Sequence, residues 1–156
     1  MENSILIKKF YTAFANFNAE EMANCYHKEV VFKDPAFGKL NQKEVTSMWK
    51  MLLERSKGNL KIEISNVVAN EKSGSANWIA TYIFSQTNRK VVNIIDAKFE
   101  FKDGLIVKHT DHFDFYKWTK QALGMKGYLL GWSNFMRNKV RQNAKKTLQN
   151  YMQKQV

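Results

Sequence analysis

The stretch Gly104-Leu-Ile-Val-Lys-His-Thr-Asp-His-Phe-Asp-Phe-Tyr116 combines the pattern of an apolar strand with ionisable side chains. Alternate residues of a strand point to the same face of a sheet. One face of this strand is therefore expected to carry Leu105, Val107, His109, Asp111, Phe113 and Phe115. Four of these six residues are apolar, which predicts that this face is buried. A buried ionisable group is costly unless it is paired or faces a cavity, so His109 and Asp111 predict a pocket for a small molecule.

The second half of the chain reads as four strands joined by tight turns, expected over 60–69, 76–87, 91–102 and 105–116. Of the turn sequences between them, Asp103-Gly104 is the strongest hairpin signal. Helices are expected earlier in the chain, over 4–17, 18–26 and 41–58, with a brief strand at 30–32. This order predicts an α+β fold in which an antiparallel sheet packs against N-terminal helices.

Three polar residues predict where helices begin. Asn18 and Asn41 each have a glutamate three residues later, which is typical of a capping box. Ser133 is expected to cap a C-terminal helix, after a short helical turn at 118–123. The apolar stripe of the C-terminal helix consists of Met136, Val140, Ala144, Leu148 and Met152.

The composition is that of one globular domain, with 156 residues, 44% hydrophobic and 25% charged. No apolar run is long enough for a membrane span. Cys25 is the only cysteine, which excludes an intrachain disulfide and favours a cytoplasmic location. Strand alternation divides His109, Asp111, His112 and Asp114 between two faces, so we expect no metal and no cofactor.

The net charge of +11 is concentrated at the C-terminus, because residues 126–156 carry +7 and contain no acidic residue. We interpret residues 1–125 as the main domain and 126–156 as a basic helical extension packed on it. A solvated helix face is the favoured explanation of this charge, and no specific nucleic acid is expected as a partner. An adaptor that touches acidic lipid or nucleic acid through this segment is an alternative.

Several short motifs resemble one known group of proteins: Tyr26, Phe32-Lys33-Asp34-Pro35, Ile94-Ile95-Asp96-Ala97 and Gly104-Leu-Ile. With the order of elements over residues 3–125, they resemble the ketosteroid isomerase-like and SnoaL-like proteins of the nuclear transport factor two-like superfamily. The resemblance implies a strongly curved sheet, wrapped against helices into a cone around an internal cavity.

The resemblance also implies roles for individual residues. Asp34 falls at the position of the general base of ketosteroid isomerases, and Asp96 at that of a protonated aspartate that donates to an oxyanion. Phe10 falls where those isomerases carry a tyrosine, so one oxyanion donor of that family is absent. Each residue also has a structural explanation: Asp34 could accept backbone hydrogen bonds in a turn, and His109 could simply pair with Asp111.

Strand register decides whether Asp96 faces the pocket. A two-residue loop at Asp103-Gly104 would place Asp96 opposite Asp111, with Phe99 and Phe101 on the other face beside Ile106. A bulge would instead turn Asp96 outward. With the first register, the apolar second face predicts a homodimer.

The sequence therefore predicts an acid–base enzyme, of isomerase, cyclase or epoxide hydrolase type, that acts on a hydrophobic carbonyl or epoxide metabolite. Asp34, Asp96, Asp111 and His109 are its expected catalytic residues. A noncatalytic binder of a hydrophobic ligand, or a dimerisation module, is the alternative. The expected ligand-binding wall is aromatic and consists of Phe10, Phe14, Tyr26, Trp49 and Phe113.

Overall fold

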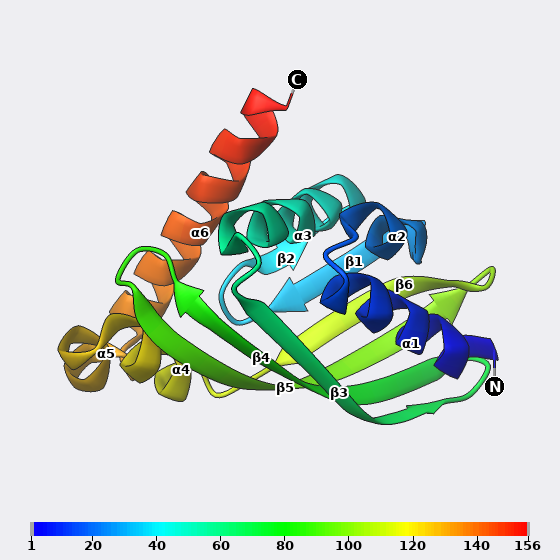
Figure 1. The fold of residues 1–156 in the computed structure, drawn as a ribbon, viewed down its shortest axis with the longest axis horizontal. Coiled ribbons are helices and arrows are strands. Elements are labelled where there is room, and N and C mark those ends of the chain that lie inside the picture. The colour runs from blue at the N-terminus through cyan, green and yellow to red at the C-terminus, as the bar shows by residue number, and fades with distance from the viewer. Residues whose placement is uncertain (1, 156) are drawn as a thin grey trace.

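The computed structural model describes residues 2–155, in which three N-terminal helices lie across the inner face of one curled, open sheet (Figure 1). The helices are α1 (Glu2–Ala15), α2 (Ala19–Asn24), α3 (Gln42–Ser56), α4 (Phe115–Leu123), α5 (Met125–Leu130) and α6 (Asn134–Lys154). The strands are β1 (Tyr26–Asp34), β2 (Gly38–Leu40), β3 (Leu60–Ala69), β4 (Ser73–Phe84), β5 (Arg89–Lys102) and β6 (Leu105–His112). The expected α+β architecture is confirmed.

The sheet has six strands rather than the expected antiparallel four, in the order β2-β1-β6-β5-β4-β3. β1 runs parallel to β6, and every other neighbouring pair is antiparallel. The expected strand at 30–32 is the middle of β1, which already begins at Tyr26. A parallel pair needs a long connection between its strands. Residues 35–104 supply that connection, so no local turn sequence could predict that β1 pairs with β6.

The predicted helix caps are confirmed by side-chain hydrogen bonds. The Asn18 side chain accepts from the backbone N–H of Glu21, and Asn41 forms a reciprocal capping box with Glu44. The Ser133 hydroxyl accepts from the backbone N–H of Met136, where α6 begins. A fourth cap corrects the end of the last strand. Asp114 accepts from the N–H of Lys117 and starts α4, so residues 115 and 116 are helical and not extended.

A β-bulge in β6 decides which side chains face inward. The Asp103-Gly104 turn forms as predicted, with φ values of 54° and 74°, and it pairs Phe101 with Ile106. Val107 is then an extra residue, because Glu100 pairs with Lys108. The bulge shifts the register by one residue. Asp111 therefore lies opposite Ala97, and Asp96 opposite His112.

This register overturns the expected placement of Asp96. Asp96 is exposed on the outer face of β5, where it accepts a hydrogen bond from the side-chain amide of Asn77. The inward row of β5 is instead the apolar one, formed by Val91, Asn93, Ile95, Ala97 and Phe99. In β6, Leu105 and Val107 were expected on the buried face, but the buried side chain there is that of Ile106.

The same register removes the residues on which the dimer prediction rested. Phe99 and Ile106 are buried inside this chain, and Phe101 is half-buried against the core. None of them belongs to an outer apolar face that a second subunit would cover. The hydrophobic core is continuous from α1 through the inner sheet face to α3, and α6 packs against α3. None of the helices within residues 2–155 has both the length and the hydrophobicity of a membrane span.

Candidate functional site

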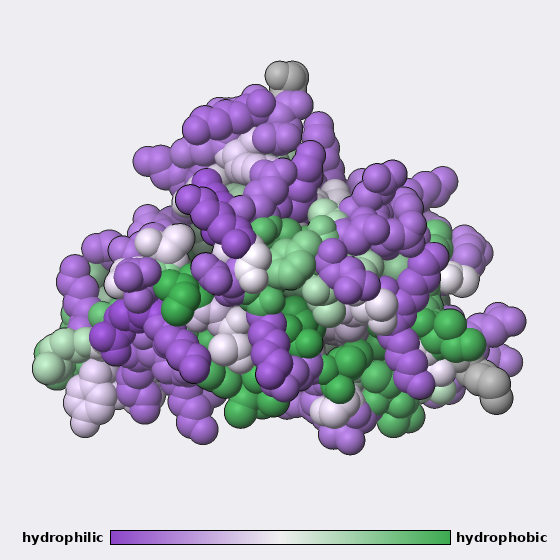
Figure 2. All heavy atoms as spheres, viewed as in Figure 1, coloured by the Kyte–Doolittle hydropathy of each residue, from purple (hydrophilic) through white to green (hydrophobic). Residues whose placement is uncertain are grey.

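A pocket of about 440 Å³ lies between α3, the inner face of the sheet, α4 and α6. Most of its wall is apolar, and the polar side chains at its inner end come from β1, β4, β5 and β6: Asp34, Tyr82, Asn93 and Asp111. Figure 2 shows hydrophilic side chains over α6 and the solvent side of α3, with hydrophobic ones gathered between α3 and the strands. A second hollow of about 500 Å³, lined by Lys98, Glu100 and Lys108, lacks a buried acid pair.

Asp111 is held in the pocket wall by a chain of buried hydrogen bonds. Trp49 Nε1–H donates to the Tyr26 hydroxyl at 2.9 Å, which lies 2.8 Å from His109 Nδ1. His109 Nε2 lies 2.9 Å from Asp111 Oδ1, and Trp78 Nε1–H donates to the same oxygen at 3.3 Å. The side chain of His109 is fully buried and that of Asp111 is 3% exposed. The network thus fixes the carboxylate at the edge of the pocket.

The donors in this chain determine where the protons lie on a neutral His109. Tyr26 has one hydroxyl proton, and its oxygen already accepts from Trp49. That proton is therefore free for His109 Nδ1, so the neutral imidazole carries its own proton on Nε2 and donates it to Asp111. Burial raises the pKa of Tyr26 well above its usual value, which keeps this hydroxyl protonated.

Only one oxygen of Asp111 is used by the protein. Oδ1 accepts both N–H hydrogen bonds, and Oδ2 accepts none from residues 2–155. Because Asp111 lines the pocket, Oδ2 is the atom available to a ligand. A proton that Asp111 gains or loses must therefore move at Oδ2.

Asp34 offers a second carboxyl group to the same pocket. Its Oδ1 accepts the backbone N–H groups of Ala36 at 2.9 Å and Phe37 at 2.6 Å, so the turn role that the sequence left open does exist. The other oxygen has no hydrogen bond within the described chain. Burial, and to a smaller extent the negative charge of Asp111, raises the pKa of Asp34 to about 7, although the two backbone donors act in the opposite direction. The pair therefore offers two free carboxyl oxygens in one apolar pocket.

Asp34 should titrate near pH 7 in a carboxyl-carbon NMR experiment assigned with Asp34→Asn. Arg141, whose guanidinium donates to the Pro35 carbonyl at 3.4 Å, lowers the pKa of Asp34. Arg141→Gln should therefore raise this pKa by a few tenths of a unit, on the order of 0.5 kcal/mol, and Arg137→Gln on the same helix should not. An unshifted titration of Asp34 in the wild type would contradict its burial.

The raised pKa of Asp34 also predicts how stability depends on pH. Folded Asp34 keeps a proton that the unfolded chain loses near pH 3.8, so the free energy of unfolding should fall as pH rises from about 4 to 7.

Asn93, which was missed from the sequence, and Tyr82, which was expected only as part of an aromatic wall, complete the polar end of the pocket. Asn93 is 8% exposed, and its side-chain amide makes no hydrogen bond within residues 2–155, so it is free to bind a ligand. Tyr82 accepts from Trp118 Nε1–H at 2.7 Å, and burial raises its pKa to about 12. A lone amide in the apolar row from Val91 to Phe99 was the available signal for Asn93, and the wrong register concealed it.

The aromatic wall predicted from the sequence divides into two layers. Phe14, Trp49 and Phe113 line the pocket. Phe10 and Tyr26 lie behind them, and the Phe10 ring packs edge-on against His109 at 5.5 Å. These two residues support the network and do not form part of the pocket wall.

The pocket contains no arrangement suited to a metal, because no group of three or more His, Cys, Asp or Glu side chains within residues 2–155 could hold one. Cys25 is buried away from the pocket, and its thiol donates to the Glu21 carbonyl at 3.3 Å. Burial raises the pKa of Cys25 to about 11, which argues against a nucleophilic role.

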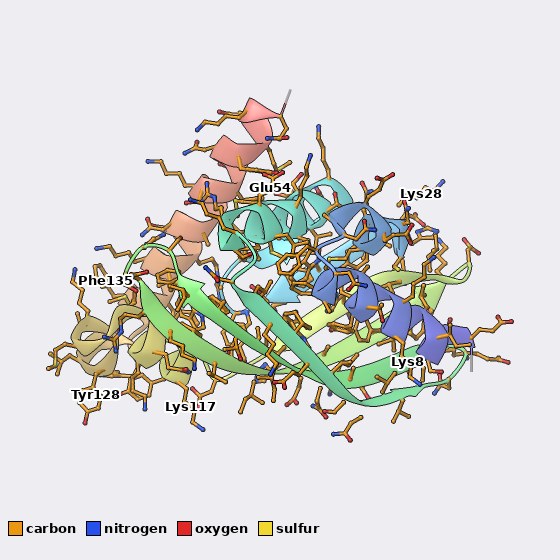
Figure 3. All side chains as sticks on the ribbon, in the orientation of Figure 1. Lys8, Lys28, Glu54, Lys117, Tyr128 and Phe135 are labelled. Carbon is orange, nitrogen blue, oxygen red and sulfur yellow. The ribbon has the colours of Figure 1, made fainter. Side chains whose placement is uncertain are left out.

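Helix α6 closes one side of the pocket through Met136, Val140 and Ala144. It is fixed at its far end, where the Tyr151 hydroxyl donates to Glu54 at 2.8 Å (Figure 3 labels Glu54 on α3). Three cationic side chains line the outer part of the pocket: Arg55, Lys126 and Lys139. The pocket therefore combines an acidic inner end, an apolar middle and a basic outer part.

Solved structures share this fold at low sequence identity. An LEH-like epoxide hydrolase from M. tuberculosis is 20% identical over 82% of this chain and 92% of that one, with a TM-score of 0.61. A proposed polyketide cyclase from Xanthomonas campestris pv. campestris is 17% identical over 77% of this chain and 96% of that one, with a TM-score of 0.62. A second proposed polyketide cyclase, from Streptomyces antibioticus, is 17% identical over 78% of this chain and 98% of that one, with a TM-score of 0.64. At this identity the likeness shows the fold alone.

Comparison with curated proteins gives no match. The SnoaL-like domain family, in contrast, matches residues 7–109, which is more than half of the chain. The match runs from α1 into β6 and ends at His109, so it includes Asp34 and most of the inner sheet face. The resemblance predicted from the sequence is confirmed: the chain belongs to the SnoaL-like domain family of the nuclear transport factor two-like superfamily.

Proposed function

We propose that this protein is an acid–base enzyme that acts on a hydrophobic metabolite with a carbonyl or epoxide group. One observation carries the proposal: Asp34 and Asp111 each use one oxygen within the protein and leave the other free in the same pocket. Pockets of about 300–1,000 Å³ accommodate small metabolites, and the volume of about 440 Å³ lies in this range.

The two carboxyl groups differ in the way that acid–base chemistry requires. With a pKa of about 7, Asp34 holds a proton in a large fraction of molecules at neutral pH and is suited to be the acid. Asp111, oriented by His109 and Trp78, is suited to be the base at Oδ2. The family resemblance implied Asp34 as the base, and its burial favours the opposite role in the first step.

With a carbonyl substrate, Asp111 Oδ2 takes the proton from the carbon beside the carbonyl, and the electron pair of that C–H bond moves to form the enolate. Asp34 stabilises the enolate oxygen by donating a hydrogen bond or its proton. With an epoxide, Asp111 takes a proton from water, whose oxygen attacks a ring carbon. The C–O bond then breaks and its oxygen takes the proton of Asp34, which yields a diol.

A deuterium-exchange assay tests the proposal because it detects proton transfer whatever the final product is. Hydrophobic cyclic ketones and epoxides are incubated with the protein, and NMR follows deuterium entry beside the carbonyl or diol formation. We expect turnover whose kcat/KM falls as pH rises through about 7, because Asp34 must be protonated. A rate that rises through this pH would make Asp34 the base. Binding without turnover across the panel would favour the noncatalytic binder.

We infer that the protein forms a homodimer through the outer face of β4 and β5. Ile94 pairs with Ile79 across these strands, and Val92 and Ile83 are exposed on the same face. Exposed apolar clusters of this kind are typical of protein interfaces. Sedimentation velocity tests this interface: the wild type should sediment as a dimer and Ile94→Lys as a monomer.

A further inference from the structure

Six of the thirteen exposed large hydrophobic side chains within residues 2–155 lie together at one end of the molecule. We call them the 125–135 patch: Met125, Tyr128, Leu129, Leu130, Trp132 and Phe135, in α5, the following turn and the start of α6. Met125, Trp132 and Phe135 are 74%, 67% and 71% exposed. Soluble proteins seldom leave so many large apolar residues together in water without a binding role.

Glycine packing forces these side chains outward. Gly127 and Gly131 lie against Thr119 of α4, so closely that a Cβ on either glycine would overlap with this residue. The inner side of α5 therefore has no room for a large side chain. The Tyr116 hydroxyl fixes α5 further by donating to the Tyr128 carbonyl at 2.8 Å. The large side chains of α5 therefore lie on the sides of the helix that do not face Thr119.

The C-terminal segment that carries the patch contains only basic charges. From residue 115 to the end, the chain has no acidic residue and nine basic ones: Lys117, Lys120, Lys126, Arg137, Lys139, Arg141, Lys145, Lys146 and Lys154. Figure 3 shows Lys117, Tyr128 and Phe135 at the same end of the molecule. Arg137 lies over the Phe115 ring at 5.7 Å, and Lys120 over the Tyr116 ring at 4.6 Å, so two of the cations are placed beside the patch.

We propose that the 125–135 patch docks this protein on the surface of an anionic lipid bilayer. Aromatic and aliphatic side chains flanked by Lys and Arg are the combination that binds the membrane interface, where rings insert and cations meet lipid phosphates. Trp132 fits this role because its ring is exposed and its Nε1–H already donates to the Leu129 carbonyl at 2.9 Å. Insertion of the ring into lipid therefore leaves no N–H group without a hydrogen bond. The docking does not depend on the proposed enzyme activity.

The position of the pocket agrees with a lipid partner. Leu130 and Phe135 belong to the patch and also line the pocket, together with Lys126. Docking through the patch would place the pocket entrance beside the bilayer. A hydrophobic ligand could then pass between lipid and pocket without crossing water.

Vesicle co-sedimentation of the full chain tests the proposal. We expect binding to phosphatidylcholine vesicles with about 30% phosphatidylglycerol, little binding to pure phosphatidylcholine, and weakening in about 0.5 M salt. Trp132→Ser with Phe135→Ser should lower the partition coefficient at least about tenfold. Ile5→Ser with Val68→Ser is the matched control, because it removes apolar residues that are 60% and 66% exposed at other sites and should leave binding unchanged.

Three results would overturn the docking proposal: no binding of the wild type to anionic vesicles, equal binding to neutral vesicles, or equal loss in both double variants. Sedimentation velocity identifies the rival occupant, a second copy of the chain. If only Trp132→Ser with Phe135→Ser dissociates a dimer, and vesicles are not bound, the patch is a contact between copies. Circular dichroism and thermal melting verify that both double variants fold.

Discussion

Asp111→Asn is expected to lower kcat about a thousandfold for any carbonyl or epoxide substrate found in the exchange assay, within the range for loss of a general base. The substitution keeps the shape of the side chain, and its amide oxygen still accepts from His109 and Trp78 in the position of Oδ1. The amide nitrogen in the position of Oδ2 cannot take a proton from the substrate. The loss should therefore be in kcat, with little change in KM.

Asp96→Asn is the matched control for this prediction. The substitution is chemically the same, but Asp96 is exposed on the outer face of β5 and contacts Asn77. We expect its kinetics to equal those of the wild type, and thermal melting of both variants excludes loss of folding. An equal decrease in both variants, or activity retained by Asp111→Asn, would remove Asp111 Oδ2 from the mechanism.

The features predicted correctly from the sequence are those that neighbouring residues determine. The caps at Asn18, Asn41 and Ser133 each depend on hydrogen bonds that reach three residues along the chain. The Asp103-Gly104 turn depends on two residues that tolerate positive φ. Such signals act in the same way whatever packs against the segment.

The features that were missed depend on contacts between distant segments. Nothing near Val107 marks it as a bulge, and the alternation in β6 alone favours burial of Leu105 and Val107. The apolar row of β5 favours the other register, and burial of Phe99 and Ile106 against the helices decides between the two. The error in one residue of register moved Asp96 to the wrong face.

The candidate site was predicted in part for the same reason. His109 and Asp111 lie beyond the bulge, where strand alternation holds, so both were correctly placed on the buried face. Their partners Tyr26, Trp49 and Trp78 come from β1, α3 and β4, and only the folded sheet brings them together. The sequence could therefore indicate which groups are buried, but not the hydrogen bonds that orient them.

Tyr26→Phe is expected to lower the free energy of unfolding by about 3 kcal/mol, because it leaves two buried partners without a hydrogen bond. Within residues 2–155, the lost hydroxyl is the only hydrogen-bond acceptor of Trp49 Nε1–H and the only side-chain partner of His109 Nδ1. Both side chains lie in the core, since Trp49 is 3% exposed and His109 is fully buried. Water therefore cannot readily replace the Tyr26 hydroxyl as their hydrogen-bond partner. Urea unfolding, read by circular dichroism, measures this loss.

Tyr151→Phe is the control for stability, because its hydroxyl donates to the exposed carboxylate of Glu54, which water can solvate instead. We expect this variant to lose less than about 1 kcal/mol. Nitrogen-15 NMR of His109 then separates positioning from simple packing. In the wild type, Nδ1 should be the unprotonated nitrogen and Nε2 the protonated one, and Tyr26→Phe should mix the two tautomers because no donor holds Nδ1. If the tautomer stays fixed while stability falls, Tyr26 supports the core without orienting His109 and, through it, Asp111.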